Sequence, residues 1–141
     1  MADHLTREQR SRAMRRVMLK NGPLERVVQR KLRELGIRFR CQGVNLPGTP
    51  DIVLAKEKIA IFVNGDFWHG YRLPQWEGKL TPFWRAKLHA NRRRDRRDAC
   101  KLRVLGWKVI RIWEHELKRN RASYVERVLS ARRSVRGGGG R

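Results

Sequence analysis

The feature that most constrains the fold of this chain is a pair of short apolar runs joined by a tight polar turn, in the stretch LPGTPDIVLAKEKIAIFVNGDFWH. The first run, 51–55, follows Pro-Gly-Thr-Pro and opens on a lone acid, Asp51. The second run, 58–64, leads into a cluster of one acid, two large aromatic residues and His69. Apolar runs of this length, bounded by turn residues, are typical of strands. We therefore expect a strand, a turn and a strand, with a carboxylate at one end and an imidazole near the other.

Helices and further strands are predicted on both sides of this hairpin. Apolar spacing and capping signals predict helices over 6–20, 23–35, 81–105 and about 115–132, the last interrupted near Asn120. Apolar residues that alternate with basic ones predict two more strands, over 37–41 and 107–113. This element order predicts a mixed sheet flanked by helices, an α/β or α+β sandwich.

The length and the C-terminal composition indicate one domain. A chain of 141 residues suits one domain with one hydrophobic core. We assign that domain to 1–134, including a basic N-terminal helix. The Gly-rich tail 135–141 is expected to be disordered.

The charge balance points to a polyanionic partner. Lys and Arg number 35 against 13 Asp and Glu, a formal net charge of +22, and nucleic acid is a better match for such a chain than a membrane. No apolar run reaches 18 residues, and the N-terminus lacks the apolar core of a signal peptide. Cys41 and Cys100 lie in segments expected to be buried, and we interpret them as free thiols in a reducing compartment. We therefore expect a cytoplasmic protein that binds nucleic acid.

Asp51 is the first candidate for chemistry. A proline before an acid at a strand start presents the carboxylate at the sheet edge, within reach of a metal ion. Hydrolysis of a phosphodiester requires charge neutralisation and an activated water, which Mg²⁺ supplies when held by a few carboxylates and waters. The alternative is that Asp51 caps a turn, a common role for an acid after proline.

Asp95 and His69 are a second candidate pair. One face of the predicted helix over 81–105 carries Asn91 and Asp95 among apolar residues, which are Trp84, Leu88, Ala99, Leu102 and Leu105. A carboxylate that faces a core needs a partner. Asp95 could accept from an imidazole and orient a catalytic histidine, or it could pair with an arginine. His69, just past a strand, is either that histidine or a structural one.

Aromatic and basic residues beside these acids suggest contact with nucleic acid. Phe67 and Trp68 either belong to the core or stack on bases, and Trp84 could join them. The run NRRRDRRD, 91–98, packs five arginines into eight residues. Contact with phosphates is the expected use of its outward-facing members, for which we name Arg92, Arg93 and Arg96; a solvated face is the alternative.

Taken in order, these segments resemble the very short patch repair (Vsr) DNA mismatch endonucleases. The matching stretches are TREQRSRAMRRV, LPGTPDIV, GDFWH, TPFW, NRRRDRRD and LGWKVIRIWEHEL, which cover most of 6–120. The resemblance implies a restriction-endonuclease-like fold of the PD-(D/E)xK group. It also implies a monomer that nicks double-stranded DNA at a T·G mismatch, beside the mispaired thymine, with Mg²⁺.

The resemblance implies a role for each candidate acid. Asp51 is then the principal metal ligand, joined by the backbone carbonyl of Val63. His69 helps to activate a water, Asp95 orients His69, and Glu25 lies close by as a supporting acid.

The resemblance further implies how the duplex is opened. Phe67, Trp68 and Trp84 would form an aromatic wedge that enters the base stack from the major groove, and Met14 would insert from the opposite side. Apolar wedges suit mismatches, because a mismatched step costs less to open.

Two departures from the family pattern stand out. Family members bind a structural zinc with cysteines and a histidine near the FWH segment and after the last strand. This chain has Asp66, the stretch 70–72 (Gly-Tyr-Arg) and His115 there, so we expect no structural zinc and a pairing of Asp66 with His115 or Arg72. Second, Asn64 cannot relay a proton as a histidine could, so activity or sequence context is expected to differ.

Two other functions remain open from the sequence. The same fold could serve a nicking enzyme of a restriction or defence system with another target. A non-catalytic DNA-binding module is the third possibility. The presence of Asp51, His69 and Asp95 argues against that module, because binding alone needs none of them.

Overall fold

The computed structural model describes residues 22–119 and 123–139, with side chains described to 135. The predicted helix over 6–20, and Met14 with it, lies outside these residues. Along the described chain, one helix is followed by three strands, two short 3-10 turns, a long helix, a fourth strand and two helices. This order confirms the predicted mixture of a sheet with helices around it.

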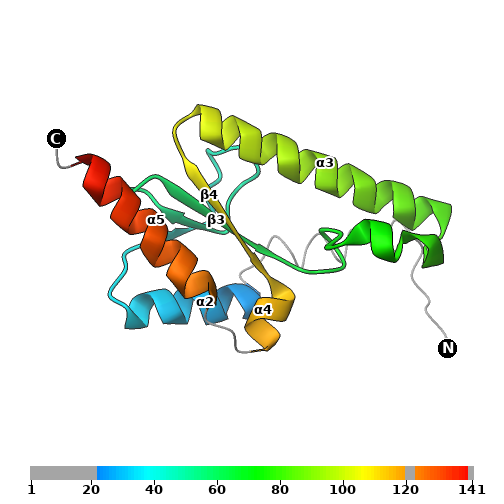
Figure 1. The fold of residues 1–141 in the computed structure, drawn as a ribbon, viewed down its shortest axis with the longest axis horizontal. Helices are drawn as coiled ribbons and strands as arrows, with labels where there is room; N and C mark the ends of the chain where they lie inside the picture. The colour runs from blue at the N-terminus through cyan, green and yellow to red at the C-terminus, as the bar shows by residue number, and fades with distance from the viewer. Residues whose placement is uncertain (1–21, 120–122, 140–141) are drawn as a thin grey trace.

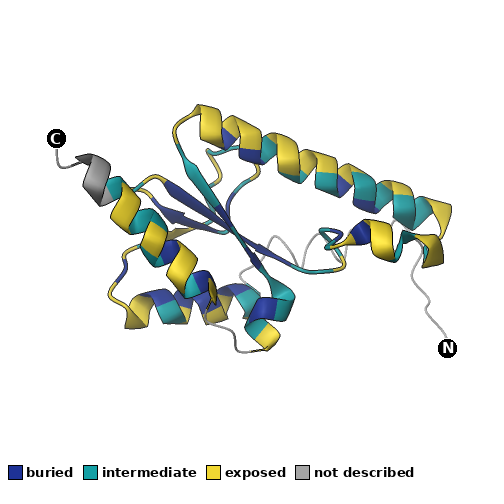
Figure 2. Ribbon diagram, in the orientation of Figure 1, coloured by how far each residue is buried: buried dark blue, intermediate teal, exposed yellow. Residues whose placement is uncertain are grey.

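The sheet has four strands in the order β1-β2-β3-β4. β1 (Arg40–Cys41), β2 (Ile52–Leu54) and β3 (Ile59–Asn64) are antiparallel neighbours. β4 (Lys108–Trp113) pairs with β3 in parallel. Every residue of β3 is buried, as the dark blue centre of Figure 2 shows. A strand covered on both faces is expected to be a continuous apolar run, and β3 is one until its last residue.

Helices lie on both sides of this sheet (Figure 1). The long α3 (Pro82–Val104) lies on one side, and α2 (Pro23–Glu34) and α5 (Ser123–Gly139) lie on the other. The short α4 (Glu114–Lys118) follows β4 directly. The main apolar cluster joins the sheet to α2 and α5, and a smaller one joins β3 to α3 through its buried members Ala60, Phe62 and Leu102. No helix among the described residues is long and apolar enough to cross a membrane.

The start of α3 and both ends of α2 follow their predicted signals. The hydroxyl of Thr81 caps α3 by accepting from the N–H of Trp84 at 3.4 Å, and Pro82 occupies the first turn. α2 starts at Pro23, and Gly36 follows its end with a φ of +71°. Glycine adopts this left-handed conformation without the strain that a Cβ would add.

Where the structure differs from the sequence-based prediction, most differences lie at the ends of elements. The strand predicted over 37–41 is reduced to Arg40–Cys41. Cys41 on this short edge strand and Cys100 on the outer side of α3 are both exposed, so the predicted burial of their segments is wrong for the thiols. Leu35 and Leu105 are exposed as well, because each is the C-cap residue where the chain leaves its helix.

The C-terminal segment also differs from its prediction. The segment predicted over 115–132, with an interruption near Asn120, forms two helices on either side of that point, α4 and α5, but α5 continues beyond 132 to Gly139. The helix therefore enters the tail 135–141 that the composition predicts to be disordered. Adding a residue to an existing helix is far easier than nucleating a new one, so α5 extends into residues that rarely start helices.

Candidate active site

Asp51 lies immediately before β2, at the end of the sheet where β3 runs on past its partner. The β2–β3 pairing ends at Ile52 and Ile61, so the N–H of Val63 has no partner in β2. The Asp51 carboxylate takes that place, and its Oδ2 accepts from the Val63 N–H at 2.7 Å. Since the N–H and C=O of a strand residue point to the same side, the Val63 carbonyl lies on the Asp51 side of β3.

Glu25, in the first turn of α2, lies beside Asp51 and is only 6% exposed. The two carboxyl groups share a hydrogen bond, and Gln42 Nε2 donates to Glu25 Oε2 at 3.4 Å. Burial, and then the neighbouring Asp51, raises the pKa of Glu25 to about 8. Burial also raises the pKa of Asp51 to about 6, although the Val63 N–H and the hydrogen bond with Glu25 oppose this. At neutral pH the pair therefore holds a proton between two acids.

The carboxyl pair has the ligand chemistry of a divalent cation site. In the described part of the chain, no group of three or more His, Cys, Asp or Glu side chains converges into a cage for a metal ion. Mg²⁺ commonly binds through one or two carboxylates, with other oxygens and several waters. Asp51, Glu25 and the Val63 carbonyl fit that pattern, since a cation between the acids would replace the proton that they share.

His69 and Asp95 form an acid–imidazole pair next to this site. His69 lies in the turn after β3, where its backbone N–H donates to the carbonyl of Gly65 at 3.1 Å. Asp95 comes from α3, and its Oδ2 lies 2.6 Å from His69 Nδ1. A carboxylate can only accept, so Nδ1 carries a proton, and in the neutral imidazole Nε2 is then the nitrogen with the free lone pair. Of the two partners that the sequence left open for the Asp95 carboxylate, the structure has the imidazole.

Two further contacts hold α3 beside this pair, one from the turn around His69 and one from β4. Asn91 is 3% exposed and donates from Nδ2 to the carbonyl of Trp68 at 2.9 Å. Arg111 of β4 donates from Nη2 to the backbone carbonyl of Asp95 at 2.7 Å. The sequence-based prediction did not single out Arg111, because the basic residues in WKVIRIW are the expected solvated members of the strand. The available signal was that its neighbours on the same face of the strand are apolar.

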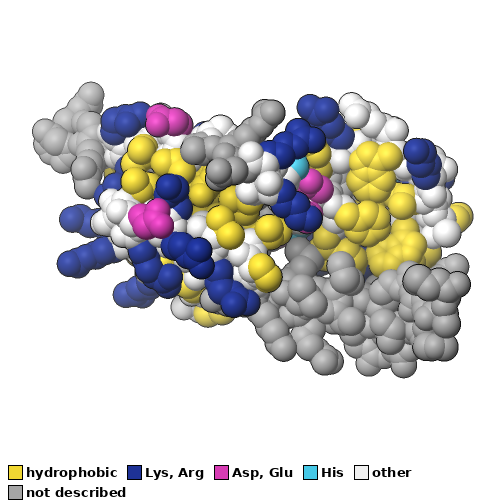
Figure 3. All heavy atoms as spheres, turned by 90° about the horizontal axis from the view of Figure 1, so that it is seen from below, with side chains coloured by type: hydrophobic (Ala, Val, Ile, Leu, Met, Phe, Trp, Pro, Cys, Tyr) yellow, Lys and Arg dark blue, Asp and Glu magenta, His cyan; other side chains and the backbone are white. Residues whose placement is uncertain are grey.

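The predicted aromatic residues gather into one cluster, which we call the aromatic cluster. Its ring centroids lie between 5.4 and 5.9 Å apart, and its members are Phe67, Trp68, Trp76, Phe83 and Trp84. Phe67 is 44% exposed, and the three tryptophans are half-buried. Figure 3 shows hydrophobic side chains at the surface over the end of the molecule where α3 begins. The cluster is therefore neither core nor fully solvated, and sequence analysis did not assign Trp76 or Phe83 to it.

The arginines of the run 91–98 differ in exposure. Arg93 and Arg96 are exposed on α3. Arg92 is half-buried, and its aliphatic stem lies against Gly70, where a Cβ would come within 2.9 Å of Arg92 Cδ. Arg94 donates to the side chain of Asn91. Two of the three predicted phosphate contacts are thus freely accessible, and the third supports the turn.

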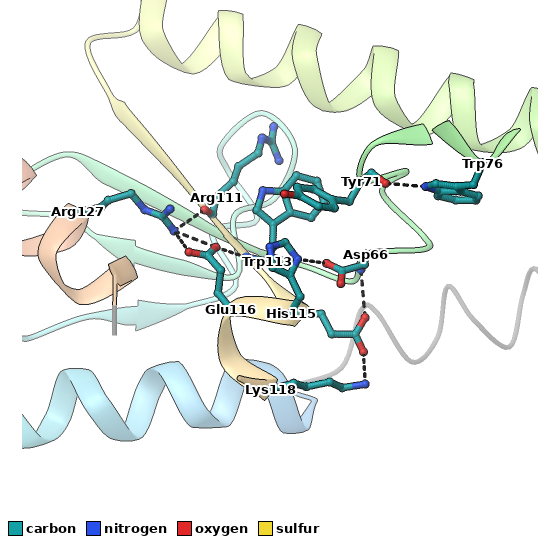
Figure 4. A network of polar contacts seen from close by, with 10 residues as sticks. Asp66, Tyr71, Trp76, Arg111, Trp113, His115, Glu116, Lys118 and Arg127 are labelled. Atoms are coloured by element: carbon teal, nitrogen blue, oxygen red, sulfur yellow. Dashed lines mark hydrogen bonds and ion pairs between the residues drawn. The ribbon is translucent and has the colours of Figure 1, made fainter. Parts of the chain in front are cut away.

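Asp66 takes part in a network of polar contacts between the turn after β3 and α4 (Figure 4). Its Oδ1 lies 3.0 Å from His115 Nδ1, and its N–H donates to Glu114 Oε1 at 3.1 Å. The ring of Tyr71 lies 4.4 Å from that of His115. Of the two partners predicted for Asp66, the structure has His115; Arg72 instead lies over the Tyr71 ring at 5.3 Å. The expected lack of a structural zinc stays a prediction.

Asn64 ends β3 and is 1% exposed. Its Nδ2 has no hydrogen-bond partner within the described ranges, which is uncommon for a buried polar group. A side-chain amide does not exchange protons as an imidazole does, which is the basis for expecting altered activity or sequence context. That expectation stays a prediction.

Comparisons with known proteins identify the family of this chain. The family model described as DNA mismatch endonuclease Vsr matches residues 2–75. The type II nicking enzyme V.XorIIP of Xanthomonas oryzae pv. oryzae is 40% identical over 119 residues, which cover 83% of this chain and 88% of that protein. The type II nicking enzyme V.NmeDIP of Neisseria meningitidis serogroup C is 35% identical over 138 residues, or 96% and 93% of the two chains. The DNA mismatch endonuclease Vsr of Escherichia coli is 36% identical over 134 residues, or 94% and 85%.

These matches are broad enough to assign the family. The family model covers more than half of the chain, and the relatives align over nearly their whole lengths. Both nicking enzymes and a mismatch endonuclease are among them, so the names agree on strand cleavage of DNA. The chain belongs to the Vsr family of DNA endonucleases.

Proposed function

We propose that this chain is a Mg²⁺-dependent, monomeric endonuclease that nicks one strand of double-stranded DNA at a T·G mismatch. The observation that carries the proposal is the convergence of two pairs, Asp51 with Glu25 and His69 with Asp95, at one end of the sheet. A hairpin that starts at a carboxylate and continues into a parallel strand also supports a restriction-endonuclease-like fold of the PD-(D/E)xK group.

The carboxyl pair would hold the cation. Asp51, Glu25 and the Val63 carbonyl supply oxygen ligands on one side of the site. When bound, Mg²⁺ would neutralise charge on the phosphate and make a coordinated water more acidic. Asp51 is held in position by the Val63 N–H, so its carboxylate keeps one orientation as substrate enters.

His69 would act as the general base. Its Nδ1–H is donated to Asp95 at 2.6 Å, which fixes the ring and leaves the Nε2 lone pair to accept a proton from the attacking water. The water oxygen then bonds to phosphorus while one backbone P–O bond breaks, and the leaving oxygen takes up a proton from solvent. Asp95 stabilises the imidazolium that forms in this step.

The aromatic cluster supports recognition of a mismatch. Phe67, Trp68 and Trp84 lie together and stay partly exposed, as a wedge into a base stack must. Inserting such a wedge costs unstacking energy, and a mispaired step lowers that cost. Arg93 and Arg96 are exposed along α3 and suit phosphate contact. The insertion of Met14 lies outside the described residues.

A nicking enzyme of a restriction system is the second candidate function. It is favoured by the type II nicking enzymes among the relatives, at 40% and 35% identity. It would use the same site and differ in the bases that it recognises. A non-catalytic DNA-binding module has no such support, because two buried carboxyl groups would repel phosphates rather than bind them.

A panel of labelled duplexes separates these functions. Duplexes with a T·G mismatch, with other mismatches and without a mismatch are incubated with the protein and Mg²⁺, with and without a chelator. We expect a single-strand nick in the T·G duplex alone, lost with the chelator and with Asp51→Asn. Glu126→Gln, a change at an exposed acid of α5, is the matched control and should cleave like the wild type.

Other outcomes of the panel have clear meanings. Equal nicking of paired and mismatched DNA would reject mismatch repair in favour of a restriction-type nicking enzyme. Tight binding without cleavage of any duplex would favour the DNA-binding module.

A further inference from the structure

Arg111 stands out because it is a half-buried cation, with a buried Nη1, on a strand face whose other members are apolar. It lies in the middle of β4, in register with Phe62 of β3. Its side chain extends from β4 toward α3 (Figure 4), and its guanidinium carbon lies 4.7 Å from the centroid of the Phe62 ring. Burial lowers the pKa of Arg111, but arginine stays protonated in proteins. A buried cation is costly unless it is compensated, so its presence needs a reason.

The contacts of this guanidinium point toward the catalytic pairs. Nη2 donates to the backbone carbonyl of Asp95 at 2.7 Å. The positive charge of Arg111 also lowers the pKa of Asp51, so the guanidinium lies within electrostatic reach of both acids. Nη1 is buried and has no hydrogen-bond partner in the part of the chain that the structure describes, so the bond to Asp95 is the guanidinium's one hydrogen bond among those residues.

Asp95 also interrupts the buried side of α3. The buried residues of α3 are Leu88, Asn91, Ala99 and Leu102. Between Asn91 and Ala99, the inward side carries Asp95 in place of an apolar residue. The bond from Arg111 therefore anchors the helix at the one turn whose carboxylate must meet His69 Nδ1 at 2.6 Å.

We propose that Arg111 is a positioning residue of the active site, which acts through Asp95 to hold the Asp95–His69 hydrogen bond in its catalytic geometry. This inference rests on the proposed role of His69 as the general base. The guanidinium is turned toward Phe62 of β3 and the Asp95 carbonyl of α3, so we expect Arg111 to act within the protein rather than on the DNA. Its removal should therefore slow the chemical step and leave DNA binding as it is.

Lys108 offers a matched control on the same strand. It is also a cation of β4, and its Nζ donates to a helix carbonyl, that of Ala131 in α5, at 3.3 Å. That contact anchors a helix on the opposite side of the sheet, away from His69. Arg111→Met and Lys108→Met thus each remove one cation and one strand-to-helix bond, but only the first should disturb the catalytic pair.

The first measurement is single-turnover nicking of the T·G duplex, together with the dissociation constant and its salt dependence. Changes to groups that orient a catalytic ligand typically cost about 10- to 100-fold in activity, and we expect a loss of that size for Arg111→Met. Arg111→Lys should recover part of the rate. Binding and its salt slope should not change. A lower salt slope with weaker binding would mean that Arg111 contacts a phosphate. A wild-type nicking rate in folded Arg111→Met would mean that Arg111 only packs. Either result overturns the proposal.

The second measurement does not depend on catalysis. In metal-free protein, the proton between His69 Nδ1 and Asp95 should give a far-downfield proton NMR signal, assigned by its loss in His69→Gln. We expect that signal to vanish or shift upfield in Arg111→Met and to persist in Lys108→Met. An unchanged signal in Arg111→Met contradicts the proposal even if the enzyme nicks DNA. A lost signal supports it even if the T·G assignment fails.

Discussion

At the scale of single residues, the site depends on two acids that share a proton. Asp51 could be singled out from the sequence because a proline and a strand start place it at a sheet edge. Its contact with Glu25 could not be derived from spacing, because α2 and the hairpin meet only in the folded chain. The structure adds that both carboxyl groups have a raised pKa. A raised pKa makes the free energy of unfolding depend on pH.

The pKa of Glu25 predicts how stability depends on pH. Its value is raised from 4.5 to about 8 in the folded protein, so the folded state binds more protons than the unfolded state between these values. The contribution of Glu25 to the free energy of unfolding is therefore complete below about pH 4.5 and is lost as pH rises toward 8. Glu25→Gln, which does not titrate, should remove this decline. Urea denaturation of metal-free protein across this range measures it.

The control for this prediction is Glu126→Gln, at an exposed position. Its pH profile should follow that of the wild type. Identical profiles for Glu25→Gln and the wild type would show that Glu25 titrates normally in the folded protein.

At the scale of elements, the loop before β2 sets the position of Asp51. Gly48 has a φ of +76°, and a Cβ there would come within 2.9 Å of Asp98 Cβ on α3. Gly36 has a φ of +71°, but a Cβ would meet nothing within 4 Å. Gly48→Ala and Gly36→Ala should each lower the free energy of unfolding by about 1 kcal/mol, because alanine is strained in the left-handed backbone conformation. Only Gly48→Ala should also displace the loop and slow nicking. Single-turnover nicking assays, with thermal melts of both variants, measure this. Equal nicking rates for the two variants would refute the prediction.

The segment between β3 and α3 carries three members of the aromatic cluster, Phe67, Trp68 and Trp76. Trp68 packs edge-on against Trp84 at 5.9 Å and remains half-buried. If it stacks on bases, Trp68→Ala should weaken binding to T·G duplex by about 1–3 kcal/mol and affect paired duplex less. Fluorescence anisotropy with both duplexes measures the difference. A large fall in melting temperature with an unchanged mismatch preference would instead place Trp68 in the core.

The elements also show where sequence reasoning succeeds and fails. The hairpin and the long helix were predictable, because strong periodicity and a cap at Thr81 define them. Asp95 was found since it interrupts an apolar face, and its partner became known only from the fold. Arg111 was missed, because in a strand with mixed neighbours a cation is assigned to solvent by default. The short β1 was overpredicted, since alternation alone cannot tell where pairing with β2 stops.

At the scale of the whole molecule, charge determines affinity and the site determines chemistry. The formal net charge of +22 predicts tight, salt-sensitive binding to any duplex. Arg93→Gln and Arg96→Gln should each weaken binding to paired and mismatched DNA equally and lower the salt slope by about 0.9. Titrations at several salt concentrations measure this. A selective loss for mismatched DNA would mean that these arginines read the mismatch rather than the backbone.

The central claim, that the Asp51–Glu25 and His69–Asp95 pairs together cut DNA, is tested most directly at His69. The measurement is the single-turnover rate of T·G nicking with saturating protein and Mg²⁺, for the wild type and His69→Gln. A positioned general base contributes about 10²- to 10⁴-fold, so we predict a loss in that range with the dissociation constant for the duplex unchanged. A His69→Gln protein that nicks at the wild-type rate would contradict the account.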